Sequence, residues 1–217
     1  MPFNNRFQFN VLPTVPVVAT PNTPNPKPQR RSHRENKAAG SDPRYYFNRF
    51  FKNYPNFDYD PSLPIMKEFH RMCDLFWPYL PKEEIPSDKK RARKDFRKAL
   101  VLQFNAIYGC DENNLADWQK LCVVLNLEYI PDELENCREL VASTYVNLVD
   151  LVDLPVTQVP ARLFRSERLL SAYTKKTGQY FPLESAYAGG LLQFLLRQIK
   201  TPGDGLAHPS LHSVCET

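Results

Sequence analysis

The sequence is poor in the residues and patterns that usually mark catalytic chemistry. It has four histidines and seven glycines in 217 residues. It contains no glycine-rich phosphate loop, nucleophile elbow or His-Glu-x-x-His zinc motif. No apolar run is long enough to cross a bilayer, and prolines interrupt the mildly apolar stretch 11–19, which argues against a signal peptide. These absences favour a nuclear or cytoplasmic protein that is not secreted, and they lower the expectation of an enzyme without excluding one.

Cysteine usage points to a reducing compartment. The five cysteines are odd in number and irregularly spaced, which does not suit a disulfide framework. Cys73, Cys122 and Cys137 fall at core positions of expected helices, so we expect reduced thiols that behave as small hydrophobic side chains. His70 and Cys73 share an expected helix face, and Cys110 or Cys122 could complete a zinc site with them, whereas the His and Cys residues of 208–215 lack a second pair of ligands. Core packing is the preferred interpretation of His70 and Cys73, and no metal or other cofactor is expected.

Proline content and charge divide the chain into three parts. Residues 1–42 are rich in proline and show no helical or strand periodicity, which predicts a disordered tail. Glycine and proline interrupt residues 201–217, which are also expected to be disordered. Residues 43–200 remain as one compact domain. Residues 1–44 hold seven Lys/Arg and two acids, so the basic excess of a chain with net charge +4 lies in the tail.

Apolar residues recur at helical spacing through the domain, which predicts an all-α compact bundle of about seven short helices. Gly109 stands where a left-handed C-terminal cap belongs, and Gly178 follows two lysines that suit a helix C-terminus. Residues 146–154 fit a short helix or a buried strand, with helix preferred, and residues 162–164 fit a brief extended segment. The expected helices cover approximately residues 43–54, 62–77, 87–108, 113–125, 132–141, 166–176 and 183–199.

The most unusual feature of the domain is a run of cations in the third expected helix. Several are like-charge neighbours four residues apart, each pair unfavourable by a few tenths of a kcal/mol, and the first ones oppose the helix macrodipole. The face therefore needs an anionic neighbour. One interpretation is a solvated face neutralised by acidic helices of the same fold; the other is a nuclear-import signal or a phosphate-contacting surface. The residues are Lys89, Lys90, Arg91, Arg93, Lys94, Arg97 and Lys98.

Two further clusters of charge deserve an interpretation. Arg30, Arg31 and Arg34 lie in the tail, where they suit either a solubilising segment or an import or nucleic-acid-binding arm. Asp150 and Asp153 lie three residues apart and would be neighbours on a helix. No histidine, lysine or glycine-rich loop accompanies them, so we interpret them as surface acids and not as a catalytic pair.

Five segments resemble a family of fungal proteins known mainly as uncharacterised sequences. They are Phe-Phe-Lys-Asn-Tyr-Pro-Asn-Phe-Asp-Tyr-Asp-Pro at 50–61, Phe-Asn-Ala-Ile-Tyr-Gly-Cys-Asp at 104–111, Trp-Gln-Lys-Leu-Cys at 118–122, Val-Asn-Leu-Val-Asp-Leu-Val-Asp at 146–153 and Tyr-Ala-Gly-Gly-Leu-Leu at 187–192. The resemblance implies a fungal source and a shared helical domain. It implies no activity and supplies no catalytic residues.

Three functions are compatible with these observations. A non-enzymatic intracellular protein-interaction module with a protein partner ranks first, because tails, basic clusters and missing catalytic motifs all suit it. An accessory protein or enzyme of a fungal metabolic pathway ranks second and requires a pocket in which polar groups such as His70, Asn105, Tyr108 and Asp150 converge. A nucleic-acid-associated nuclear factor ranks third, and no membrane partner is expected.

Overall fold

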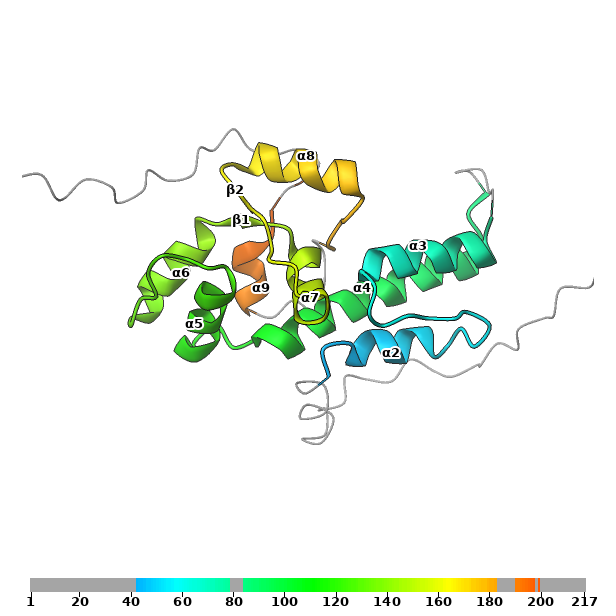
Figure 1. Ribbon diagram of the computed structural model, residues 1–217, viewed down its shortest axis with the longest axis horizontal. Helices are drawn as coiled ribbons and strands as arrows, with labels where there is room; N and C mark the ends of the chain where they lie inside the picture. The colour runs from blue at the N-terminus through cyan, green and yellow to red at the C-terminus, as the bar shows by residue number, and fades with distance from the viewer. Residues whose placement is uncertain (1–41, 79–83, 183–189, 198, 200–217) are drawn as a thin grey trace, which may run out of the picture. The chain divides into compact units, whose positions relative to one another are not determined.

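The computed structural model describes residues 42–78, 84–182, 190–197 and 199, and these residues fold as an all-α bundle (Figure 1). This confirms the predicted fold class. The predictions for the two tails, including Arg30, Arg31 and Arg34, and for His208, His212 and Cys215 lie outside the described residues. The described helices are α2 (Tyr45–Phe51), α3 (Ile65–Phe76), α4 (Ser87–Tyr108), α5 (Leu115–Val124), α6 (Leu134–Ala142), α7 (Leu148–Thr157), α8 (Glu167–Thr177) and α9 (Gly190–Leu195).

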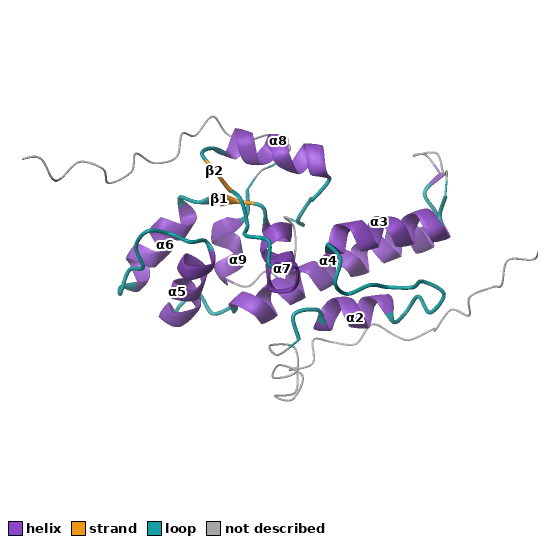
Figure 2. Ribbon diagram, in the orientation of Figure 1, coloured by secondary structure: helices purple, strands orange, loops and turns teal. Residues whose placement is uncertain are grey.

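A two-stranded antiparallel ribbon is the only sheet among the described residues (Figure 2). Strand β1 (Tyr145–Val146) pairs with β2 (Leu163–Phe164), with Tyr145 opposite Phe164 and Val146 opposite Leu163. The extended segment expected at 162–164 is therefore present. The ambiguous stretch 146–154 contains both alternatives, because one strand residue precedes α7.

Helices α2, α3 and α4 lie side by side in Figure 1, and aromatic side chains fill the space between them. The rings of Phe69 and Phe96 stack with their centroids 4.0 Å apart, and Phe50 contacts both. Buried Gln103 of α4 accepts a hydrogen bond from the backbone N–H of Tyr46 at 2.9 Å. These contacts hold the first half of α4 rigidly against the rest of the bundle.

Helix α7 runs through the centre of the described domain, and a proline near its end is compensated by another helix. Pro155 has no N–H to donate to the carbonyl of Leu151, four residues earlier. The hydroxyl of Tyr108, at the end of α4, donates to that carbonyl instead, at 2.7 Å. The helix consequently continues to Thr157, three residues beyond the predicted end.

The interpretation of Asp153 as a surface acid was wrong, and Arg44, one of the seven cations counted in residues 1–44, is buried as well. Asp153 is 5 % exposed and Arg44 is 2 % exposed, and their side chains form a salt bridge of 2.7 Å. The other guanidinium donors of Arg44 bond the carbonyls of Pro61 and Leu63. The Asp153 carboxylate also accepts from the N–H of Ile65 at 3.0 Å, so it caps the start of α3 from a distant helix.

Predicted helix ends agree most closely with the structure for α4 and α8. Helix α4 begins at Ser87 and ends at Tyr108 as expected, and Gly109 has a positive φ of 95° but an extended ψ of 170° instead of the left-handed cap. The side chains of Asn114 and Ser166 cap α5 and α8. Helix α3 starts at Ile65, later than expected, because Ser62 bonds Asp60 in a turn.

Candidate functional site: the basic face of helix α4

Six exposed cations form one face of the N-terminal half of α4, and we call them the α4 basic face. Helical spacing places Lys90, Lys94 and Arg97 in one stripe, because they lie four and seven residues apart. The stripe is opposite buried Phe96, so it points away from the core. The face consists of Lys90, Arg91, Arg93, Lys94, Arg97 and Lys98, all exposed.

Lys89 belongs to the same run of cations but has a structural contact of its own. Its ammonium donates to the carbonyl of Trp77 at 3.3 Å, while the indole N–H of Trp77 donates to Asp88 at 2.9 Å. Asp88 also accepts from the backbone N–H of Lys89 at the first turn of α4. This link ties the start of α4 to the end of α3, so Lys89 is separated in role from the α4 basic face.

The described carboxylates do not neutralise this face by direct pairing. Three salt bridges join described residues elsewhere, and each of them involves a different cation. Among the residues that the structure describes, no carboxylate forms a salt bridge with Lys90, Arg91, Arg93, Lys94 or Arg97. For these five cations the predicted neutralisation by acidic helices of the same fold is therefore not seen as ion pairs among the described residues, and they present their charge to solvent.

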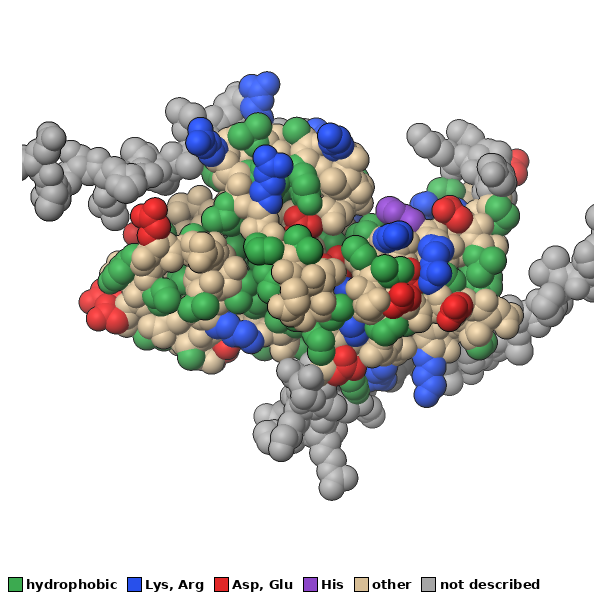
Figure 3. Space-filling model, in the orientation of Figure 1, with side chains coloured by type: hydrophobic (Ala, Val, Ile, Leu, Met, Phe, Trp, Pro, Cys, Tyr) green, Lys and Arg blue, Asp and Glu red, His purple; other side chains and the backbone are tan. Residues whose placement is uncertain are grey.

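Sequence reasoning missed an acidic counterpart at the other end of the described domain. The segment 110–142, which contains α5 and α6, holds eight acids and two cations. A count of charge in this window would have shown it, but the acids are spread through it singly or in two adjacent pairs, with apolar residues between them. Figure 3 shows acidic side chains at the end formed by α5 and α6, with hydrophobic side chains between them.

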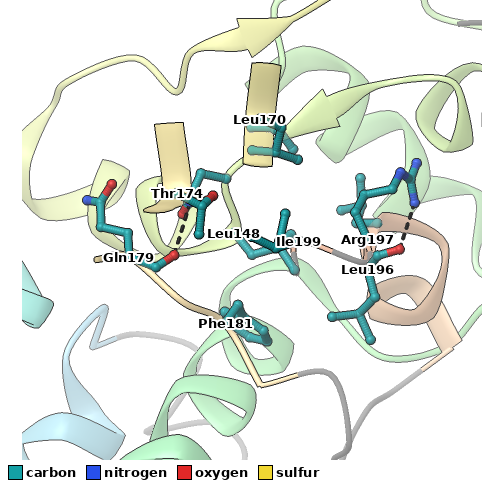
Figure 4. A pocket seen from close by; sticks show the side chains of 11 residues that line it. Leu148, Leu170, Thr174, Gln179, Phe181, Leu196, Arg197 and Ile199 are labelled. Carbon is teal, nitrogen blue, oxygen red and sulfur yellow. Dashed lines mark hydrogen bonds between the residues drawn. The ribbon is translucent and has the colours of Figure 1, made fainter. Parts of the chain in front are cut away.

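A small hollow lies between α7, α8 and the residues after α9 (Figure 4). Its cavity volume is about 20 Å³, which is room for a single water molecule. Pockets for small substrates typically measure about 300–1,000 Å³. Leu148, Leu170 and Phe181 are among the side chains that line it. The hollow is therefore a packing defect and not a binding pocket for a substrate.

The polar residues expected to mark an enzyme pocket do not converge. Tyr108 is buried and bonds a carbonyl of α7, and burial raises the pKa of its hydroxyl. Asp150 accepts from the hydroxyl of Tyr173 at 3.0 Å, and burial also raises the pKa of Asp150. His70 is exposed on α3, so its expected core packing was wrong. Nothing in this arrangement pairs an acid with a base around an open space.

The cysteines of the described domain are positioned as packing residues. Cys73, Cys122 and Cys137 are buried and unbridged, as expected, whereas Cys110 is exposed. Burial raises the pKa of all three buried thiols, that of Cys122 to about 11, so they remain protonated and weakly nucleophilic near neutral pH. Within the described ranges, no three His, Cys, Asp or Glu side chains are grouped so that they could hold a metal ion.

Asn147 shows how a residue without a sequence signal organises the region around the hollow. Its side-chain oxygen accepts from Val149 N–H at 2.9 Å and caps α7, while its amide donates to Thr174 and to the carbonyl of Gln179. These bonds connect α7 to α8. They satisfy the amide of Asn147, which is buried beside the hollow.

Each helix in the described part of the chain is too short or too polar to cross a bilayer. Comparisons of the sequence with models of protein families and with curated proteins, and of the structure with solved structures, find no match. The resemblance to a fungal family therefore stays a prediction.

Proposed function

We propose that the protein is a non-enzymatic protein-interaction module that binds an acidic protein partner through the α4 basic face. The observation that carries this proposal is the exposed stripe of Lys90, Lys94 and Arg97 on a helix whose opposite side is locked by stacked aromatic rings. A charged stripe that is packed against the core on its other side, and whose Lys90, Lys94 and Arg97 form no ion pairs with described carboxylates, is available for a complementary surface. The small hollow and the dispersed polar residues support a binding role over catalysis.

A protein partner suits the charge distribution better than a nucleic acid does. The described residues hold 20 Lys/Arg and 19 Asp/Glu, so the described domain is close to neutral and α4, with seven of those cations, is a local basic element and not part of a generally basic surface. The stripe from Lys90 to Arg97 extends about 10 Å along the helix axis. That length corresponds to two or three turns of a facing helix. Nucleic-acid domains usually present a broader basic surface to a regular series of phosphates.

The proposal is tested with a labelled acidic helical peptide and the full-length chain. Fluorescence anisotropy measures its Kd for the native chain and for the triple variant Lys90→Glu, Lys94→Glu, Arg97→Glu. Exposed charge pairs contribute about 0.5–1 kcal/mol each, so three reversals weaken binding about 10- to 100-fold. The matched control reverses three exposed cations near α8, Arg165, Arg168 and Lys176, and should leave Kd within about twofold.

Two results would contradict the proposal. Equal Kd values for the native chain and the α4 variant would remove the α4 basic face from binding. Tighter binding of a random-sequence DNA duplex than of the peptide, with affinity falling steeply with salt, would replace the protein partner with a nucleic acid. Both measurements use one instrument and one set of variants, so the two functions are compared directly.

Nuclear location is a second part of the proposal, supported by the same exposed cations. Lys89 holds the start of α4, so a variant that tests nuclear location should leave Lys89 intact. We expect a fluorescently tagged chain to accumulate in the nucleus, and the variant Lys90→Glu, Lys94→Glu to lose that accumulation. Cytosolic retention of the native chain would contradict this part and leave the binding proposal standing.

A further inference from the structure

The α5–α6 hairpin, residues 110–142, carries exposed carboxylates that form no salt bridges with described cations. Glu128, Asp132 and Glu139 are exposed, and none of them forms a salt bridge with a described cation. In the same hairpin Glu135 pairs with Arg138 at 3.0 Å. This pair of helices therefore presents excess negative charge, which is complementary to the positive charge of the α4 basic face.

Exposed apolar side chains accompany these acids. Val123 is 60 % exposed, Tyr129 63 % and Ile130 42 %. Tyr129 and Ile130 follow Glu128 directly, and Asp132 comes two residues later. A surface that combines carboxylates with exposed aromatic and branched side chains suits a protein partner, because the apolar groups gain from burial and the charges set the register.

The acidic hairpin cannot reach the basic face of its own molecule. The midpoint of the basic stripe, Lys94, is fourteen residues before the end of α4, which corresponds to about 20 Å along the helix. Helix α5 starts beyond that end, and Figure 1 places α5 and α6 away from the start of α4. The Debye length at physiological salt is about 8 Å, so the two charged surfaces scarcely attract each other within one chain.

We propose that the acidic partner of the α4 basic face is the α5–α6 hairpin of a second copy of this chain. The inference rests on the proposed function, since it identifies the partner of the same face. The two surfaces are different and lie far apart on one molecule, so each copy offers both at once. Such a heterologous, head-to-tail contact produces a closed ring if its rotation closes and an open chain if it does not.

The charges and apolar groups predict a weak, salt-sensitive association. Carboxylates at Glu128, Asp132 and Glu139 face cations at Lys90, Lys94 and Arg97 of the neighbouring copy, while Tyr129 and Ile130 lose contact with water. Interfaces of this kind fall among transient contacts, which bury less than about 1,200 Å². Raising salt to 1 M shortens the Debye length to about 3 Å and should dissolve the assembly.

Sedimentation velocity of the full-length chain at low salt tests the inference. The native chain should sediment faster as concentration rises. The α4 variant (K90E/K94E/R97E) and a hairpin variant (E128K/D132K/E139K) should each need at least a tenfold higher concentration to associate. The control with reversed charges at Arg165, Arg168 and Lys176 should associate like the native chain.

Mixing the two variants provides the decisive arm. In an equimolar mixture the native basic face of one variant meets the native acidic hairpin of the other, and the two reversed surfaces also complement each other. Association should return, which also shows that both variants are folded. A mixture that remains monomeric, or a native chain that is monomeric at every concentration, overturns the inference.

The outcomes separate this inference from the proposed function. If the acidic peptide binds the α4 basic face while the native chain stays monomeric, only the self-association fails. If neither binding nor association depends on the α4 basic face, both fail. A further variant with Arg30, Arg31 and Arg34 reversed to Glu should associate normally. Loss of association in that variant would show that the tail, and not α4, supplies the basic surface, and it would overturn the assignment to α4.

Discussion

The buried salt bridge between Arg44 and Asp153 predicts a large loss of stability when one of its two charges is removed. We consider Asp153→Asn, which keeps the size of the side chain but removes its charge. The Arg44 guanidinium would then stay buried with a neutral neighbour, although its bonds to the carbonyls of Pro61 and Leu63 remain. Breaking one side of a buried ion pair costs about 3–5 kcal/mol. That is a large part of the 5–15 kcal/mol by which a domain is typically stable.

Urea denaturation followed by tryptophan fluorescence measures this loss. Trp118 is fully buried between α5 and its neighbours, so its emission reports on unfolding of the core. Asp74→Asn is the matched control, since Asp74 lies exposed on α3, and it should change the free energy of unfolding by no more than about 0.5 kcal/mol. A loss below about 1 kcal/mol for Asp153→Asn would refute the reasoning.

Substitution of the other partner of the salt bridge, Arg44→Met, separates the effect of charge from that of packing. It leaves the Asp153 carboxylate buried beside the N–H of Ile65 without its cation. Burial already raises the pKa of Asp153, and Arg44 opposes that rise. Without Arg44 the pKa rises further, so the variant should regain stability as the pH falls and the carboxylate is protonated. A pH-independent loss would show that the salt bridge is not the cause.

Two further predictions follow from α7. Tyr108→Phe leaves the carbonyl of Leu151 without a hydrogen-bond donor and should lower the free energy of unfolding by about 1–3 kcal/mol. Adding Pro155→Ala supplies a backbone N–H for that carbonyl and should recover most of the loss in the same urea assay. If nothing is recovered, the hydrogen bond from Tyr108 does not replace the one that Pro155 lacks. Burial raises the pKa of Asp150, so the folded chain binds a proton at this carboxyl more tightly than the unfolded chain does, and the contribution of this group to native stability should rise as the pH falls from 7 to 5. Urea midpoints that fall over this range would show that other groups dominate.

The sequence was informative wherever one element contains its own signal. The ends of α4 follow from Ser87 and Gly109, and the opposition of Phe96 to the cations follows from helical spacing alone. The candidate face was therefore predictable to the residue, apart from Lys89. Its contact with Trp77 depends on how α3 meets α4, which no local pattern records.

Features that depend on distant residues were not predictable. Arg44 and Asp153 are 109 positions apart, and each looks like an ordinary surface charge in its own segment. The orientation of Asp153 on α7 could not be predicted either. The residues before it on α7, namely Leu148, Val149, Leu151 and Val152, are all buried. A helix that is buried on most sides has no outward stripe against which an inward-facing acid could be recognised.

The α4 basic face is stable without a partner, and this bears on how it can bind. Three like-charge pairs four residues apart in the α4 basic face cost about 1 kcal/mol in total, whereas burial of Phe96 and Leu100 on the core side of the helix contributes about 3–6 kcal/mol. Packing therefore outweighs repulsion, and α4 keeps its shape while its charge stays exposed. A face that is already ordered loses little conformational entropy on association. Weak charge pairs on such a face can consequently support a specific contact that would be too weak on an unstructured segment.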